Sequence, residues 1–225
     1  MNILVVAPHA DDEILGCGGV IARHAAAGDV VTVAVMTDAS KGAPELYDEN
    51  YILGLRKEAQ AAHEFLGVSE TRFFDFPAPR LDTYPRYKVA AALGELVGEI
   101  RPEVMFVPHF GDLHVDHGAV YNAALVAARP VVGCSVHSIY AYETLSETEW
   151  ASPQSGAAFS PNHYVDISVF LAKKLDAMRC YESQLKSFPS PRSIEAIEAL
   201  ARYRGASVGY SAGESFAVVR TLLPA

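Results

Sequence analysis

Two short runs of the sequence carry histidines and carboxylates at spacings that can hold a metal ion. In the first run, residues 8–13 (PHADDE), His9 and Asp12 lie three positions apart. The second run, residues 109–117 (HFGDLHVDH), ends in two histidines that share one face if a helix starts there. A catalytic zinc binds three protein ligands and keeps one position open for water. Imidazole nitrogens and carboxylate oxygens are both suitable ligands. The residues that fit such a site are His9, Asp12 and His117.

Two further side chains in these runs can supply the catalytic groups. Asp11 can accept a proton from a water whose pKa the metal has brought to about 7, and can later return it to a leaving group. His114, when protonated, can hydrogen-bond the oxyanion that forms as water adds to a carbonyl. Together these parts predict metal-assisted hydrolysis of an amide or ester.

Each run also has a purely structural interpretation. Asp11 or Asp12 can cap the following helix, with neighbouring acids adding favourable charge near its N-terminus. The histidines of residues 109–117 can be exposed side chains of a polar loop and helix start. Taken singly, the runs leave these alternatives open.

The two runs directly follow two predicted strands, and this placement favours the metal interpretation. Short apolar strands alternate with amphipathic helices, which is typical of a mostly parallel, doubly wound Rossmann-like α/β sheet with helices on both faces. In the usual doubly wound order the first and fourth strands are neighbours, so the two runs would meet beyond their carboxyl ends. The predicted strands are 2–7, 30–36, 71–76, 104–107, 138–142 and 215–219, and the predicted helices are 15–27, 51–66, 87–100, 169–184 and 193–203.

Composition limits the class of protein. Half of the 225 residues are apolar and a fifth are charged, which indicates one folded domain over residues 1–225. We expect a Rossmann-like core over about 1–130 and a C-terminal part that completes the substrate pocket. A net charge of −9 without a basic cluster argues against a nucleic-acid partner. No run approaches the roughly 20 apolar residues of a transmembrane segment, and the three scattered cysteines favour a cytoplasmic location.

The pattern His-x-Asp-Asp-Glu after the first strand, followed much later by His-x-x-Asp-His, resembles the LmbE-like or PIG-L family of zinc-dependent N-acetylglucosaminyl deacetylases. Residues 56–58, 181–184 and 209–216 extend the resemblance along the chain. It implies one Zn²⁺ per chain, with another divalent ion such as Fe²⁺ as the alternative. It also implies these roles: zinc ligands His9, Asp12 and His117, general base Asp11, and oxyanion donor His114.

The resemblance extends to the substrate. Arg56 matches an arginine on the sugar-binding side of the pocket in relatives, although a solvated helix charge is the alternative. Asp82 lies in a proline-rich loop and either lines the sugar pocket or forms a local ion pair. The implied substrate is a small N-acetylated sugar whose aglycone stays open, and relatives are commonly homo-oligomers.

Two rival functions also have support in the sequence. The glycines of residues 16–19, with Asp38 about twenty residues on, suggest a nucleotide-binding module. However, their spacing is not GxGxxG, and the acids at 11–13 would repel a pyrophosphate. The second rival is a metal-dependent phosphoester hydrolase, but such enzymes often bridge two metals with carboxylates, whereas one His/Asp/His set suits a single ion.

Overall fold

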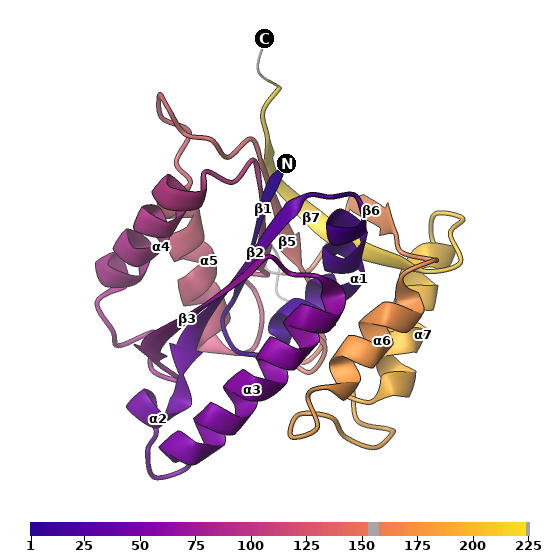
Figure 1. Ribbon diagram of the computed structural model, residues 1–225, viewed down its shortest axis with the longest axis horizontal. Helices are drawn as coiled ribbons and strands as arrows, with labels where there is room; N and C mark the ends of the chain where they lie inside the picture. The colour runs from indigo at the N-terminus through magenta and orange to yellow at the C-terminus, as the bar shows by residue number, and fades with distance from the viewer. Residues whose placement is uncertain (153–157, 224–225) are drawn as a thin grey trace.

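A seven-stranded sheet forms the centre of the protein in a computed structural model that describes residues 1–152 and 158–223. The strand order is β3-β2-β1-β4-β5-β7-β6 (Figure 1), and only the β5–β7 and β7–β6 pairs are antiparallel. The predicted single-domain, mostly parallel α/β fold is confirmed. The strands are β1 (Asn2–Ala7), β2 (Val30–Asp38), β3 (Glu70–Pro77), β4 (Val104–Pro108), β5 (Ser138–Tyr142), β6 (His163–Asp166) and β7 (Gly213–Thr221). The helices are α1 (Asp12–Ala26), α2 (Ala39–Gly42), α3 (Glu49–Leu66), α4 (Arg86–Ile100), α5 (Val115–Ala127), α6 (Leu171–Arg179) and α7 (Ile194–Ala206).

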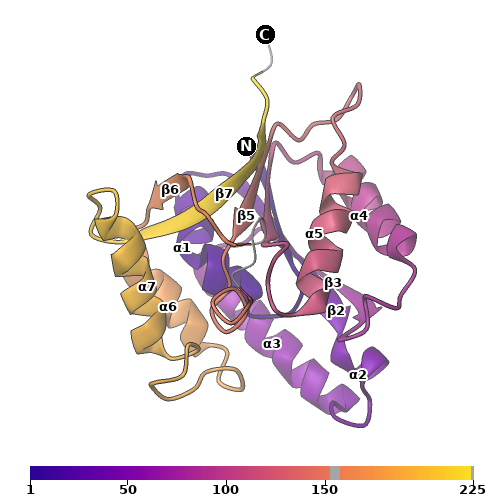
Figure 2. The same ribbon diagram turned by 180° about the vertical axis from the view of Figure 1, so that it is seen from behind.

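Helices cover both faces of the sheet. Figures 1 and 2 show α4 and α5 on one face and α1, α3, α6 and α7 on the other. Along β1, Ile3 and Val5 pack with the α1 side, whereas Leu4 and Val6 pack with the α4 and α5 side. A strand buried on both faces has apolar residues at successive positions, which explains the unbroken apolar run at the start of the chain.

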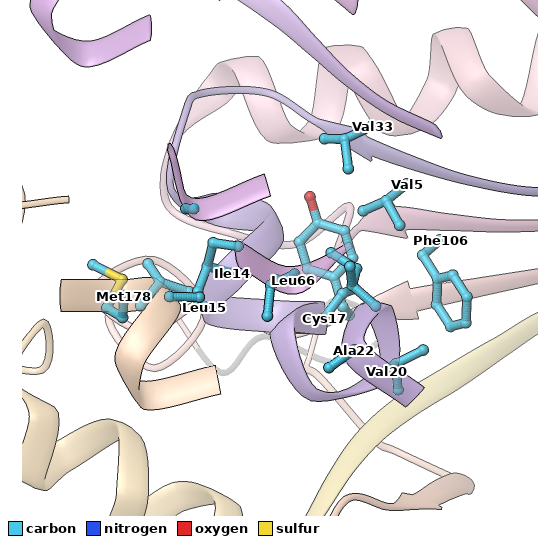
Figure 3. Packing of buried hydrophobic residues seen from close by; sticks show 14 of the residues in the cluster. Val5, Ile14, Leu15, Cys17, Val20, Ala22, Val33, Leu66, Phe106 and Met178 are labelled. Atoms are coloured by element: carbon cyan, nitrogen blue, oxygen red, sulfur yellow. The ribbon is translucent and has the colours of Figure 1, made fainter. Parts of the chain in front are cut away.

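The larger of the two cores lies between the sheet and α1. Figure 3 shows Val5 and Val33 of the sheet near Cys17 of α1, with Leu66 and Met178 contributed by α3 and α6. Cys17 is fully buried, in keeping with a packing role. This core fixes α1, and α1 begins in the first polar run.

Pairing of β1 with β4 brings the two polar runs together. Ile3 pairs with Val104 and Val5 with Phe106 in parallel register. Because the carboxyl ends of parallel strands meet at one edge, the runs after β1 and β4 share that edge. The predicted adjacency of the first and fourth strands is confirmed.

Several element boundaries differ from those predicted. Helix α1 starts three residues early, because the Asp11 carbonyl accepts hydrogen bonds from the amides of Ile14 and Leu15. Helix α6 ends at Arg179 instead of 184, where the chain enters turns around Tyr181. Strand β6, helix α2 and the full length of α5 were not predicted. Residues 146–162, which lie between the predicted strand 138–142 and the predicted helix 169–184, include residues 153–157, which lie outside the described residues.

None of the helices in the described part of the chain is long and apolar enough to cross a bilayer.

A buried ion pair ties α1 to the C-terminal elements. The Glu214 carboxylate accepts hydrogen bonds from the amides of Gly19 (2.8 Å) and Val20 (2.7 Å). The Lys174 ammonium lies 2.6 Å from Glu214 and donates to the Leu15 carbonyl at 2.8 Å. Side chains of α6 and β7 thus bond backbone groups of α1, so the C-terminal elements help to position this helix.

We predict that Lys174→Met destabilises the protein by about 3–5 kcal/mol, because it leaves the Glu214 carboxylate buried without its counter-charge. Urea unfolding of the purified variant would measure this. Lys57→Met, at an exposed helix position, is the control and should change stability by no more than about 0.5 kcal/mol. A loss below about 1 kcal/mol for Lys174→Met would contradict the assigned role of the pair.

Candidate functional site

The three residues expected to bind a metal converge at the carboxyl edge of the sheet. His9 and Asp12 follow β1, and His117 lies in the first turn of α5. One ligand atom from each lies within 4.8 Å of the others. Asp12 Oδ2 is 3.3 Å from both His9 Nδ1 and His117 Nε2. The side chains of Asp12 and His117 are fully buried, whereas that of His9 is a quarter exposed and gives the cluster an open side.

The donor atoms of this cluster fit a cation. Asp12 Oδ1 and His117 Nε2 are buried and make no hydrogen bond to any residue that the structure describes. A buried polar atom without a partner costs free energy, and a cation between these atoms would satisfy both. Burial disfavours the charged form of His9, yet hydrogen bonds with Asp116 and Asp12 outweigh it and raise the pKa of His9 to about 9. The surrounding carboxylates therefore favour positive charge here, and two imidazoles with one carboxylate suit zinc.

Asp112 orients His117. His117 Nδ1 donates to Asp112 Oδ2 at 2.8 Å, and Asp112 Oδ1 accepts from the Thr148 hydroxyl at 2.7 Å. This bond turns Nε2 toward Asp12. Carboxylates that hold the second nitrogen of a metal-binding histidine fix its tautomer and its ring. Asp112 belongs to the second polar run, but the sequence analysis assigned it no role.

A second cluster adjoins the first and shares His9. His9, His114 and Asp116 also bring ligand atoms within 4.8 Å of one another. Asp116 Oδ2 is 3.1 Å from His9 Nε2, and its Oδ1 accepts from the Leu81 amide at 3.0 Å. The residue common to both clusters is a histidine and not a bridging carboxylate. The geometry therefore favours a single ion over a carboxylate-bridged metal pair.

Asp11 adopts a backbone conformation that few residues other than glycine tolerate. Its φ of 116° lies in the left-handed region, which indicates local strain. The Asp11 side chain makes no capping hydrogen bond with α1, although it occupies the N-cap position. Asp12 does not cap the helix either, because its Oδ2 accepts from the His9 amide at 2.9 Å. The capping interpretation therefore accounts for neither carboxylate.

Glu13 holds the strained turn in place. Its Oε2 accepts from the Asp11 amide at 3.1 Å. Its Oε1 is bonded by the Tyr181 hydroxyl and by His63 Nε2 at 3.1 Å. His63 in turn bonds the Thr71 hydroxyl at 2.8 Å and is buried, which indicates a structural role. His63 of α3, held by Thr71 of β3, and Tyr181 of the turn after α6 thus fix the carboxylate that supports Asp11.

The Asp11 carboxylate faces an arginine that the sequence analysis did not identify. Asp11 Oδ2 lies 3.0 Å from Arg192 Nη1, and the Asp11 side chain is 2 % exposed. Burial raises the pKa of Asp11 to about 7, against the opposing effect of the Arg192 charge. A carboxylate that titrates near neutrality can both accept and return a proton. Arg192 precedes α7 in an irregular segment, where no motif or periodicity marks it.

His114 presents a hydrogen-bond donor to the site in its neutral form. It is the N-cap of α5, where its Nδ1 accepts from the Asp116 amide at 3.2 Å. Burial and the nearby charge of His9 lower the pKa of His114 to about 4. Because Nδ1 accepts, the proton sits on Nε2. The protonated His114 that the sequence analysis invoked is therefore not required for donation.

A cavity of about 350 Å³ opens beside the metal cluster. His9, Asp11 and His114 line its inner end, and Glu147, which accepts from the His114 amide at 3.1 Å, lies beside them. Gln184 and Arg192 come from the C-terminal part of the chain. The other lining residues are Ala10, Ala39, Leu46, Tyr47, Tyr51, Ile52, Leu55, Ala78 and Pro79.

Arg56 and Asp82, the two residues expected to bind substrate, lie outside this cavity. Arg56 lines a small adjoining cavity of about 50 Å³ together with His9. Its guanidinium bonds Asp38 and Asp75, so it is not simply a solvated helix charge. Asp82 is exposed and lines a different cavity of about 370 Å³, which also includes His114.

The features that suggested a nucleotide site have structural roles. Gly16 and Gly19 lie inside α1 and not in a loop before it. A Cβ at Gly16 would come within 2.3 Å of the Tyr142 ring, and one at Gly19 within 2.7 Å of Ile167, so close packing requires both glycines. Asp38 caps α2 by accepting from the Ser40 amide.

Known proteins are similar to this chain in both sequence and fold. Residues 4–128 match the family described as PIG-L: GlcNAc-PI de-N-acetylase. The chain belongs to this family. An Escherichia coli protein named uncharacterized deacetylase YaiS is 27% identical over 187 residues, which cover 81% of this chain and 91% of YaiS. As a PIG-L family member the chain is a hydrolase of carbon–nitrogen bonds other than peptide bonds, as predicted.

Two further proteins resemble nearly the whole chain. The diacetylchitobiose deacetylase of Thermococcus kodakarensis is 25% identical over 223 residues, which cover 97% of this chain and 83% of that enzyme. The crystal structure of the conserved protein TT1542 from Thermus thermophilus has a TM-score of 0.77 at 27% identity and covers 99% of this chain and 96% of its own. The similarity therefore includes the C-terminal elements beyond residue 128.

We predict that Asp112→Ala weakens Zn²⁺ binding by about 10–100-fold, because His117 loses the partner that orients its ring. Competition with a chromophoric chelator would measure the affinity. Asp82→Ala removes an exposed carboxylate outside the metal cluster and should leave the affinity unchanged. Equal affinities for Asp112→Ala and the parent protein would show that Asp112 does not support the site.

Proposed function

We propose that this protein is a zinc-dependent deacetylase that removes the N-acetyl group from an N-acetylglucosamine-type sugar or conjugate. The observation that carries the proposal is the convergence of the His9–Asp12–His117 cluster, Asp11 and His114 on one end of a single cavity. The diacetylchitobiose deacetylase among its relatives supports the choice of substrate. Zn²⁺ is the proposed ion, with Fe²⁺ as the alternative, because two imidazoles and a carboxylate suit either.

Each catalytic side chain has a defined proton to hold or move. A metal held by His9, Asp12 and His117 would supply Lewis acidity and so lower the pKa of water at the open side of the cluster. Asp11 accepts the proton of the attacking water and returns it to the amine nitrogen as the carbon–nitrogen bond breaks, which releases acetate and the free amine. Its burial and its near-neutral pKa suit both transfers.

His114 stabilises the charge that develops on the acetyl oxygen. Its Nε2–H is free to donate because Nδ1 is already bonded to the α5 backbone. A donor fixed by a helix N-cap needs little reorganisation during the reaction, which is the basis of oxyanion stabilisation. The strained turn at Asp11 and the helix start at His114 thus hold the base and the oxyanion donor at one end of the cavity.

Several residues are proposed to act at the periphery of the site. Arg56 and Asp82 are proposed to contact the sugar from the two adjoining cavities. The C-terminal part is proposed to complete the substrate pocket through Gln184 and Arg192. A cytoplasmic location is proposed because all three cysteines are free. Assembly into a homo-oligomer remains part of the proposal.

We predict that His117→Ala depletes bound zinc, whereas Asp11→Asn retains zinc yet loses about 10²–10⁴-fold in turnover. The difference follows because His117 is a proposed ligand and Asp11 moves protons. Metal analysis of the purified variants, alongside release of amine from N-acetylated glycosides, would measure both effects. Full activity of Asp11→Asn would show that another group is the base.

A matched pair of assays separates amide from phosphoester hydrolysis. We predict that the metal-loaded protein releases acetate from N-acetylglucosaminides and no measurable phosphate from aryl phosphates, because the described site offers no carboxylate-bridged metal pair. Phosphate release that exceeded acetate release would favour the rival function.

A further inference from the structure

The outer wall of the catalytic cavity is apolar and aromatic. Leu46 is 73 % exposed, and Tyr47 and Tyr51 are 37 % and 39 % exposed, yet all three line this cavity. The rings of Tyr47 and Tyr51 lie 5.4 Å apart and tilted by 42°. Large apolar side chains grouped on an exposed surface commonly mark a binding site. These three residues, called the Leu46–Tyr51 wall below, have no role in the proposed chemistry.

The Leu46–Tyr51 wall is held in place. Gln184 Nε2 donates to the Tyr51 hydroxyl at 2.9 Å, and Gln184 Oε1 accepts from Arg192 at 3.2 Å. The amides of Leu46 and Tyr47 both donate to the Ala43 carbonyl, which closes the turn that carries them. A wall fixed in this way binds a ligand at a lower entropic cost than a mobile one.

The charges near this wall disfavour an anionic ligand. Arg192 lines the cavity, but its guanidinium already lies 3.0 Å from Asp11 and 3.9 Å from Glu147. Arg56, in the adjoining cavity, pairs with Asp38 and with Asp75. A phosphate or carboxylate on the ligand would have to displace a carboxylate from one of these arginines, and it would approach the remaining acids.

We propose that the Leu46–Tyr51 wall binds an uncharged aryl or alkyl aglycone of the substrate. This inference rests on the proposed function, because the wall and the catalytic residues share one cavity. The acetylated sugar occupies the inner end, beside His9, Asp11 and His114, and the aglycone extends outward over the two tyrosines. An aryl or alkyl group gains free energy there by removing apolar surface from water. The wall would then select the aglycone, and the metal cluster would carry out the deacetylation.

Turnover of a matched substrate set tests the proposal. Phenyl and octyl N-acetylglucosaminides, free N-acetylglucosamine, N,N'-diacetylchitobiose and N-acetylglucosamine 1-phosphate would be compared by kcat/KM in the metal-loaded protein, with both anomers where they exist. We expect the phenyl and octyl glycosides to exceed the other three by at least about tenfold, mainly through a lower KM. A preference for the 1-phosphate or for chitobiose would overturn the proposal.

Two variants assign the preference to the wall. The double variant Leu46→Ala/Tyr47→Ala should reduce the preference for the phenyl glycoside over free N-acetylglucosamine, measured as the ratio of their kcat/KM values, to about threefold or less. Leu53→Ala is the matched control, because Leu53 is 55 % exposed on α3 and does not line the cavity. An unchanged preference in the double variant would also overturn the proposal. All three positions are exposed, so folding should be preserved.

Calorimetric binding separates failure of the wall from failure of the proposed function. In Asp11→Asn, phenyl N-acetylglucosaminide should bind at least about tenfold more tightly than free N-acetylglucosamine, and Leu46→Ala/Tyr47→Ala should remove that difference. If no substrate releases acetate and this binding pattern is observed, the proposed deacetylase function is wrong and the proposed binding role of the wall is supported. If acetate is released and the binding pattern is absent, the proposed binding role of the wall is wrong and the deacetylase function is supported.

Discussion

The parallel pairing of β1 with β4 is the constraint on which the site depends. It brings His9 and Asp12, at the start of the chain, within ligand distance of His117. Helices on both faces bury the two strands, so their register is fixed by packing on each side. The polar residues that follow the two strands therefore meet at the carboxyl edge of the sheet.

The site carries local costs that the rest of the fold offsets. Asp12 Oδ1 and His117 Nε2 are buried without hydrogen-bond partners among the described residues, and Asp11 adopts a left-handed backbone conformation. Opposing these costs are the Glu13 network, the Asp112 carboxylate behind His117 and the large core under α1. Such an arrangement is expected of a functional site, where strain persists only when the surroundings determine it strongly.

Much of the fold and of the candidate site could be predicted from the sequence. The metal ligands could be predicted because both polar runs follow clear apolar strands. The usual strand order then places these two strands side by side, which brings the runs together. The role of Arg192 could not be predicted, because the position of Arg192 depends on how an irregular segment folds back over the sheet edge. Helix α6 was predicted too long because Tyr181 leaves the helix to reach Glu13, a tertiary contact that propensity cannot reveal. The wall of the cavity also depends on side-chain exposure, which sequence does not give.

Anomalous diffraction at the zinc edge, from crystals of the protein loaded with Zn²⁺, tests the central claim most directly. We predict one strong peak per chain, coordinated by His9, Asp12 and His117, with Asp11 nearby but not coordinating. A peak centred instead on His9, His114 and Asp116, or one ligated by Asp11, would contradict the assignment of ligands and base. The absence of any peak at this edge of the sheet would contradict the metal site itself.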